Sequence, residues 1–214
     1  MINFGKAFTY IFEDERWFDK LLTPLLVSLI PIIGTMAFTG YILRTIKNVI
    51  QNEPHPLPNY NFSEDLGRGF RYFLVGLVYA LPIFLLFWIM FIPMTMIDNS
   101  QTAIGFGAIL ILIIGGIIMF AYSLFLALLQ PIAMANFAMK DTFASAFEWS
   151  SFFKRLGNNF TAWLLVFAGV LISGFISPLG SILFIIGVVI TSAYSQLMVA
   201  HLTGQAYAAS EVKR

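Results

Sequence analysis

The sequence predicts an all-α integral membrane protein: four transmembrane helices in two hairpins, an N-terminal re-entrant or broken helical hairpin, and interfacial amphipathic helices. Three observations support this fold class. Only 11% of the 214 residues are charged and 59% are hydrophobic, more apolar surface than a soluble chain of this length can bury. No Asp, Glu, Lys or Arg occurs in residues 72–97, 99–139 or 156–210. All 12 Lys and Arg gather in the few segments outside these runs.

Residues 1–20 are expected to form an interfacial helix that lies in the plane of the membrane surface. At helical spacing, one face of this stretch carries the apolar side chains Phe4, Phe8, Ile11, Phe18 and Leu22. Aromatic rings, here also that of Trp17, favour the depth of the lipid headgroups. Two interpretations stay open: the helix senses lipid or docks a partner, or it only anchors the bundle.

Residues 21–43 are apolar and long enough to cross a membrane once, but Pro24, Pro31, Gly34 and Gly40 interrupt the run. Basic residues flank the segment on both sides, and loops rich in Lys and Arg face the cytoplasm. We therefore favour a re-entrant hairpin that turns at a hinge of Pro31 and Gly34 and returns to the same side. One ordinary tilted span is the alternative.

Residues 44–71 are expected to form a cytoplasmic loop with proline at every second position from 54 to 58. Proline fixes φ and lacks an N–H group, so this stretch is predicted to be extended and polyproline-like. Either Pro54, His55, Pro56 and Pro58 form a strip that recognises a partner, or the loop is a stiff spacer.

The rest of the chain divides into two hairpins and a connecting helix. The expected boundaries are 72–139 for hairpin 1, 140–158 for an interfacial helix and 159–210 for hairpin 2. Asn61, with Glu64 three residues later, is a helix-start pattern before hairpin 1. The spans are expected at Ile104–Gln130, Asn159–Ile176 and Ser181–Thr203, with one more before residue 98. Turns without Lys or Arg are expected at Asp98–Thr102 and Ser177–Gly180. The interfacial helix carries three aromatic side chains suited to lipid or partner contact: Phe143, Phe147 and Trp149.

The two hairpins resemble each other at an offset of 72 residues. Ile113-Ile114-Gly115 recurs as Ile185-Ile186-Gly187, and Ala121-Tyr122-Ser123 recurs as Ala193-Tyr194-Ser195. Both copies are expected to start on the inner side, which would make them parallel repeats.

Small residues recur every four positions in the last two spans, in the stripes Gly169, Ser173, Ser177 and Gly187, Thr191, Ser195. Small side chains let membrane helices approach closely. We favour packing within the bundle over an oligomer seam.

The predicted spans lack the charged residues that catalysis or coupled transport places inside a membrane. The chain has no cysteine, and its formal net charge of +1 argues against nucleic-acid binding. His201, near the inner end of the last span, is the one cofactor candidate. A lone imidazole can ligate haem iron or a chlorin magnesium, or it can hydrogen-bond between helices. We expect no enzyme, no metal site and no cofactor.

Several motifs carry a family resemblance: Phe4-Gly5-Lys6-Ala7-Phe8, Phe12-Glu13-Asp14, Leu29-Ile30-Pro31-Ile32-Ile33-Gly34, Gly40-Tyr41 and Glu53-Pro54-His55-Pro56-Leu57-Pro58. In these residues the chain resembles a prokaryotic family of multi-pass membrane proteins catalogued as a domain of unknown function. The resemblance implies a bacterial or archaeal plasma membrane, and it carries no activity and no catalytic residues that could be transferred to this chain.

These observations predict a non-catalytic membrane scaffold or accessory subunit in the plasma membrane, with its basic loops and C-terminus in the cytoplasm. Its partners would be membrane lipids and another membrane protein or a second copy, with no nucleic acid. A small transporter or pore that uses the broken first segment is one alternative, and a pigment- or haem-associated subunit is another.

Overall fold

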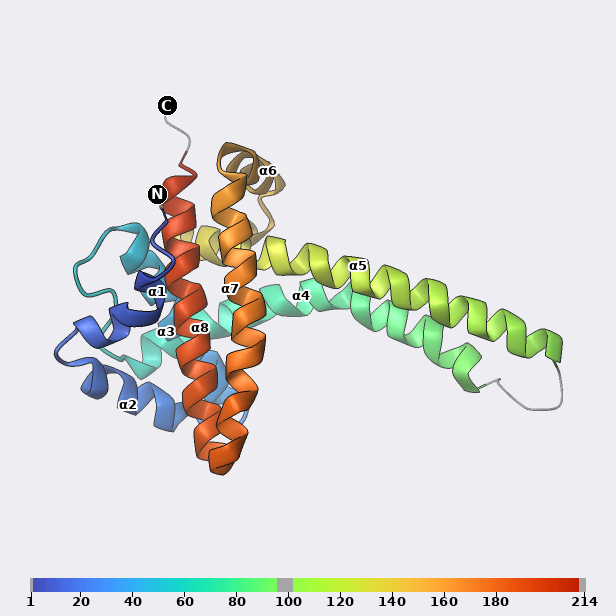
Figure 1. Ribbon diagram of the computed structural model, residues 1–214, viewed down its shortest axis with the longest axis horizontal. Helices are drawn as coiled ribbons and strands as arrows, with labels where there is room; N and C mark the ends of the chain where they lie inside the picture. The colour runs from blue at the N-terminus through green and yellow to red at the C-terminus, as the bar shows by residue number, and fades with distance from the viewer. Residues whose placement is uncertain (1, 96–101, 212–214) are drawn as a thin grey trace. The chain divides into compact units, whose positions relative to one another are not determined.

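The computed structural model describes residues 2–95 and 102–211, and this part of the chain contains helices and no strand (Figure 1). In order, the helices are α1 (Lys6–Thr9), η1 (Tyr10–Glu13), α2 (Trp17–Ser28), α3 (Ile33–Ile50), α4 (Phe62–Thr95), α5 (Thr102–Lys140), η2 (Phe143–Phe147), α6 (Trp149–Asn158), α7 (Phe160–Leu179), η3 (Gly180–Leu183) and α8 (Phe184–Ala209). Among the described residues, four helical stretches are long and apolar enough to cross a membrane: Phe62–Ile92, Phe106–Lys140, Phe160–Ile182 and Phe184–Ala209. The predicted class, an all-α membrane protein with four spans, is confirmed.

The chain divides into two compact units, each described here by itself. The first unit is Met1–Phe73 with Leu128–Arg214, and the second unit is Leu74–Ala127. The single membrane domain expected for residues 1–214 stays a prediction.

The described residues of the second unit are the C-terminal part of α4 and the N-terminal part of α5. Within it, the hydroxyl of Tyr122 donates to the carbonyl of Tyr79 at 2.9 Å, and the α5 backbone at Gly115 lies against the side chain of Met90. Most of its large apolar side chains are exposed; Trp88, for example, is 60% exposed. Such an exterior suits helices surrounded by lipid.

Residues 1–20 do not form the single helix expected from the sequence. The chain instead passes through the short elements α1 and η1, and α2 begins at Trp17. Ile11, which was expected on the lipid face, is 1% exposed. Its neighbour Tyr10 is also buried and donates from its hydroxyl to the carbonyl of Leu197 in α8 at 3.0 Å. The periodicity was misleading because this segment packs on α8 rather than on lipid alone.

The broken segment forms two helices in contact, α2 and α3. Pro31 lies in the break, and the next residue, Ile32, has a positive φ of 65°. Gly34 is buried in the first turn of α3, where a Cβ would overlap the carbonyl of Val27. The other two expected interruptions are not breaks, since Pro24 lies inside α2 and Gly40 inside α3. Entry of this hairpin into a membrane stays a prediction.

Two expected helix ends are wrong. α5 continues through Pro131 to Lys140, beyond the expected end at Gln130, and α7 continues through Pro178 to Leu179. The turn that follows α7 is η3, a few residues later than expected. An unpaired backbone N–H or C=O group is costly in lipid. The helix therefore continues past a single proline and keeps its other intrahelical hydrogen bonds. The other expected turn, Asp98–Thr102, lies largely outside the described residues, as do the terminal Lys213 and Arg214.

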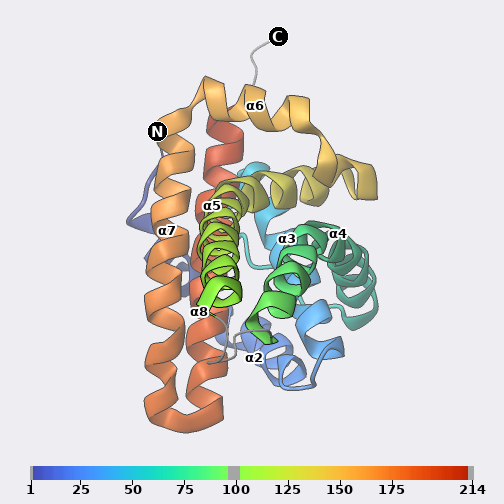
Figure 2. The same cartoon turned by 90° about the vertical axis from the view of Figure 1, so that its right-hand side faces the viewer.

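Asparagine side chains cap the N-termini of two of the spanning helices. Oδ1 of Asn61 accepts the backbone N–H of Glu64 at 3.3 Å, which confirms the helix-start pattern read from the sequence. Oδ1 of Asn159 likewise accepts the N–H of Ala162 at 3.1 Å at the start of α7. Inside the first unit, α7 and α8 lie side by side (Figures 1 and 2), and α3 also packs on α8.

Candidate functional site

The proline-rich loop (Gln51–Tyr60) is held on the first unit through its backbone carbonyls. Three side chains donate to three of them: Asn48 Nδ2 to Pro56 at 2.9 Å, Lys20 Nζ to Leu57 at 2.8 Å, and Arg44 NH2 to Asn59 at 2.8 Å. Prolines cannot donate N–H groups to a neighbouring strand, so their extended backbone relies on outside donors for its carbonyls. The loop is therefore docked at fixed points on α2 and α3.

The docked loop has a buried half and an exposed half. Pro56, Leu57 and Pro58 are buried, and Leu57 is only 1% exposed. Residues 51–55, which include Pro54 and His55, are all exposed. Of the four residues expected in a recognition strip, Pro54 and His55 are thus available to a partner, whereas Pro56 and Pro58 face the protein.

Lys20 reaches the loop because a buried carboxylate holds its ammonium. Nζ of Lys20 lies 2.6 Å from Oδ2 of Asp14, and the two side chains are 10% and 7% exposed. Oδ1 of Asp14 also accepts the backbone N–H of Arg16 at 3.0 Å. Burial by itself raises the pKa of the Asp14 carboxyl, but the hydrogen bonds from Lys20 and Arg16 outweigh it and hold this pKa below its ordinary value.

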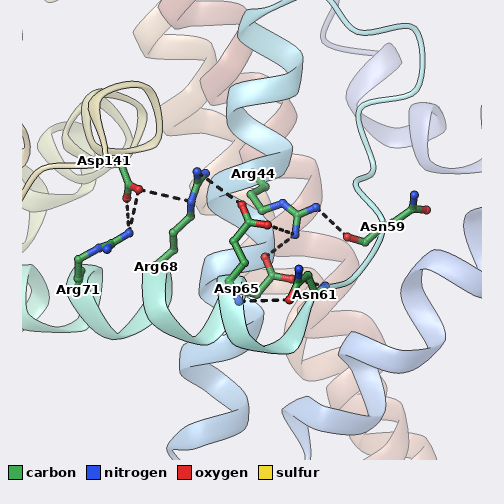
Figure 3. A network of polar contacts seen from close by, with 8 residues as sticks. Arg44, Asn59, Asn61, Asp65, Arg68, Arg71 and Asp141 are labelled. Atoms are coloured by element: carbon green, nitrogen blue, oxygen red, sulfur yellow. Dashed lines mark hydrogen bonds and ion pairs between the residues drawn. The ribbon is translucent and has the colours of Figure 1, made fainter.

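Arg44 joins the loop to the start of α4 (Figure 3). Its NH1 donates to Oδ1 of Asp65 at 3.0 Å, and the Asp65 carboxylate has no exposed surface. The other oxygen, Oδ2, accepts the backbone N–H of Asn61 at 3.0 Å. One guanidinium therefore ties α3, the end of the loop and the first turn of α4 together.

The charged network continues along α4 to the residue after α5, within the first unit (Figure 3). NH2 of Arg71 donates to both carboxylate oxygens of Asp141 at 2.8 Å, and Nε of Arg68 lies 3.8 Å from Oδ2 of the same residue. Asp141 has a positive φ of 52°, so the chain turns sharply where α5 ends. Arg68 also lies 3.7 Å from Glu64, which links this cluster back to Arg44 through a 3.6 Å contact.

Two glycines let α3 and α4 approach closely enough for these contacts. A Cβ on Gly40 would overlap the carbonyl of Asp65, and a Cβ on Gly69 would overlap the carbonyl of Met36. The backbones themselves are in contact, so no larger residue fits. Sequence reasoning missed both Gly69 and Asp65. The seven-residue spacing between Gly69 and Gly76 places both on one helix face, but this is only a weak signal of close packing.

The predicted aromatic contacts fall into two groups. Phe4 and Phe8 are half-buried, with ring centroids 5.6 Å apart, and the hydroxyl of Tyr194 in α8 donates to the carbonyl of Phe8 at 2.9 Å. The ring of Trp17 packs on exposed Phe12 at 5.3 Å.

The second group lies around η2 and α6. Phe143 and Trp149 are exposed, and the ring of Phe143 contacts half-buried Phe147 at 5.1 Å. On α6, Phe152 is buried and Phe153 is 64% exposed. Exposed aromatic rings are suited to the headgroup depth of a membrane, but the contact of these rings with lipid or a partner stays a prediction.

His201 is 4% exposed and stacks on the ring of Tyr10 at a centroid distance of 4.2 Å. Its Nδ1 lies 2.7 Å from Nε2 of Gln205, whose Oε1 accepts the backbone N–H of Asn3 at 2.7 Å. Among the described residues, no group of three or more His, Cys, Asp or Glu is placed to hold a metal ion. The contacts of His201 thus join α8 to the N-terminal segment.

The two small-residue stripes meet where α7 and α8 pack. Oγ of Ser177 and Oγ of Ser195 lie 2.8 Å apart, and Oγ1 of Thr191 donates to the carbonyl of Ser177 at 2.7 Å. A Cβ on Gly169 would overlap the Leu202 side chain. Of the other members, Gly187 is buried and Ser173 is half-buried.

Together, these features define an all-helical, multi-pass membrane protein with a proline-rich loop docked on a helical hairpin. The chain belongs to the family described as "Protein of unknown function (DUF4013)", whose model matches residues 24–190. It is similar to an uncharacterized protein of Methanocaldococcus jannaschii, with 28% identity over 157 residues that make up 71% of this chain and 53% of the relative. The chain thus spans about half the length of this curated relative. No solved structure matches it significantly.

Proposed function

We propose that this protein is a non-catalytic membrane scaffold or accessory subunit that presents the exposed half of its proline-rich loop to another membrane protein. The observation that carries the proposal is the division of the loop. Residues 56–58 are buried, and the carbonyls of Pro56, Leu57 and Asn59 accept hydrogen bonds from side chains, while Pro54 and His55 stay exposed beside them. A stiff spacer needs no such anchoring, whereas a recognition strip gains affinity when it is held in one conformation before binding.

The charges around the loop support a structural role rather than catalysis. Asp14 pairs with Lys20, Asp65 with Arg44, and Asp141 with Arg71. Groups that neutralise each other at such distances hold helices in place, and they are poorly suited to act as general acids or bases. We therefore infer that the protein is not an enzyme.

The same network supports the proposed orientation. Arg71 in the first turns of α4 and Asp141 just after α5 are in direct contact, so the two ends of this hairpin belong on one side of the membrane. By the positive-inside rule that side is the cytoplasm, in the plasma membrane of a prokaryote, and the α2–α3 hairpin returns to it.

A site-specific photo-crosslinker at His55 tests the proposal. The full-length protein is isolated from its native membrane in mild detergent after illumination, with a second crosslinker at exposed Lys154 on α6 as the matched control. We expect the His55 probe to give one defined adduct with another membrane protein, and the Lys154 probe to give none with that partner. A lone monomer without an adduct contradicts the proposal.

Two variants separate recognition from folding. P54A/H55A removes only exposed side chains and is expected to abolish co-isolation of the partner while leaving the free energy of unfolding within about 0.5 kcal/mol of wild type. L57A empties a buried position and is expected to cost about 2–5 kcal/mol of stability. Retention of the partner by P54A/H55A rejects the loop as the recognition surface.

A further inference from the structure

A polar cleft of about 240 Å³ lies between the start of α2 and the end of the proline-rich loop. It is lined by Arg16, Asp19, Lys20, Thr23, Asn59 and Tyr60. This volume is far above the roughly 15 Å³ that one ordered water requires, so the cleft has room for a small polar group. The scaffold role proposed above does not require a ligand in this cleft.

Of the three charged residues that line the cleft, one is paired and two are not. Lys20 is neutralised by Asp14 at 2.6 Å, so it offers a ligand little net charge. The side chains of Arg16 and Asp19 are exposed, and neither forms an ion pair or hydrogen bond with another side chain in the described part of the chain. A ligand therefore meets one free guanidinium and one free carboxylate.

The tyrosine in the cleft wall is also incompletely bonded. The hydroxyl of Tyr60 is buried and has no hydrogen-bond partner among the described residues, and the same holds for Tyr41 behind it, at a ring-centroid distance of 6.4 Å. Buried hydroxyls nearly always have a partner in native proteins. Of these two residues, Tyr60 lines the cleft, so the cleft wall includes a residue whose polar atom no described group satisfies.

We propose that this cleft binds a zwitterionic group made of a phosphate ester and a primary ammonium, with the phosphate on Arg16 and the ammonium on Asp19. A guanidinium matches phosphate oxygens through parallel hydrogen bonds, and a carboxylate accepts from an ammonium. A purely anionic ligand would leave Asp19 opposed by like charge, and a purely cationic one would leave Arg16 so opposed.

The position of the cleft favours a phospholipid headgroup as the source of this group. The apolar run of α2 begins at Leu21, directly after the cleft residue Lys20, and the rings of Phe12 and Phe18 are each 56% exposed. Exposed aromatic residues at the start of an apolar segment are typical of headgroup depth. Free phosphoethanolamine has the same chemistry and is the second possible source.

The test measures ligand binding to the full-length protein in detergent by native mass spectrometry. The probes are short-chain phosphatidylethanolamine, phosphatidylcholine and phosphatidylglycerol, together with soluble phosphoethanolamine. Phosphatidylcholine keeps the phosphate but its quaternary ammonium cannot donate hydrogen bonds, and phosphatidylglycerol has no ammonium. We expect phosphatidylethanolamine to bind about tenfold or more tightly than either, the scale of one charge-assisted hydrogen bond.

Two cleft variants and two matched controls assign the roles. R16Q is expected to weaken phosphatidylethanolamine binding by about tenfold or more, and D19N to remove the preference over phosphatidylcholine. That preference is a ratio within one preparation, so partial unfolding does not alter it. E15Q and K154Q change exposed charges that do not line the cleft, and they are expected to bind as wild type does.

Each outcome decides the proposal. Binding of phosphatidylethanolamine but not of phosphoethanolamine supports a lipid site, and equal binding of both supports a site for the free zwitterion. Equal binding of the three lipids by wild type overturns the proposal, as does wild-type behaviour of R16Q and D19N.

Discussion

The guanidinium of Arg44 donates a 3.0 Å hydrogen bond to the carboxylate of Asp65, which has no exposed surface. Arg44 itself is 17% exposed and also binds the carbonyl of Asn59. A buried carboxylate that loses its only cation is left uncompensated, which typically costs several kcal/mol. This ion pair therefore couples the stability of the α2–α3 hairpin to that of the loop and of α4.

Replacing Arg44 is expected to destabilise the protein strongly. R44M keeps the volume of the side chain but removes its charge, and it should lower the free energy of unfolding by about 3–5 kcal/mol, because Asp65 stays buried without a cation. Denaturant unfolding in detergent measures the loss. K47M, on the same helix at a half-buried residue outside the network, is the control and should change stability little. R44M/D65N should recover part of the loss, and a double variant no better than R44M contradicts this account.

The Asp14–Lys20 pair predicts a dependence of stability on acid. Hydrogen bonds from Lys20 and the Arg16 backbone hold the pKa of Asp14 below its ordinary value in the folded protein. The stabilisation is therefore fully present above the unfolded pKa of about 3.9 and is lost as pH falls through the lower, folded pKa. D14N should be less stable than wild type near pH 7, and the difference should shrink below about pH 4. Thermal unfolding across this range measures it, with E15Q as a control for charge alone. A constant difference at all pH values is the contrary result.

Two glycines two residues apart in α4 should respond oppositely to alanine. G69A places a methyl group against the carbonyl of Met36, so the helices must separate, at a cost of about 1–3 kcal/mol or more. G67A meets no atom within 4 Å and should stabilise the helix by up to about 1 kcal/mol through lower backbone entropy in the unfolded chain. Unfolding free energies of the two variants make the comparison. Equal effects would show that α3 and α4 do not touch here.

The contact between Ser177 and Ser195 should be weakly coupled. Hydrogen bonds between membrane helices average about 0.6 kcal/mol in double-mutant cycles and reach about 1.7 kcal/mol. The cycle of S177A, S195A and S177A/S195A should therefore give a coupling energy within that range. S173A/S195A serves as the control pair, because Ser173 has no described bond to Ser195, and its coupling should be near zero. Coupling in the control as large as in the test pair would place the interaction elsewhere.

Features that depend on neighbouring residues were read correctly from the sequence. The charge-free runs predicted four spans because the length of apolar chain needed to cross a bilayer is a local property. Pro31 marked a real break, and Asn61 marked a real helix start, since both act on the backbone next to them. Pro131 and Pro178 misled because a long apolar helix tolerates one missing hydrogen bond.

Features that depend on distant residues were not visible. Tyr10 lies in the stretch expected to form a surface helix, yet its hydrogen-bond partner lies 187 positions away in α8. Asp65 was not singled out from the sequence, and the close approach of α3 at Gly40 accompanies its burial. No local pattern records which backbone lies opposite a glycine.

The sequence by itself determined that this is a helical membrane protein, where its spans lie, and where its first segment breaks, because hydrophobic length, charge and proline act locally. Only the tertiary structure decided how the proline-rich loop is held. Its carbonyls are satisfied by Lys20, Arg44 and Asn48 from two other helices, and that docking separates a buried half from an exposed one. Proline spacing predicts an extended chain, but the donors that hold it come from elsewhere in the fold.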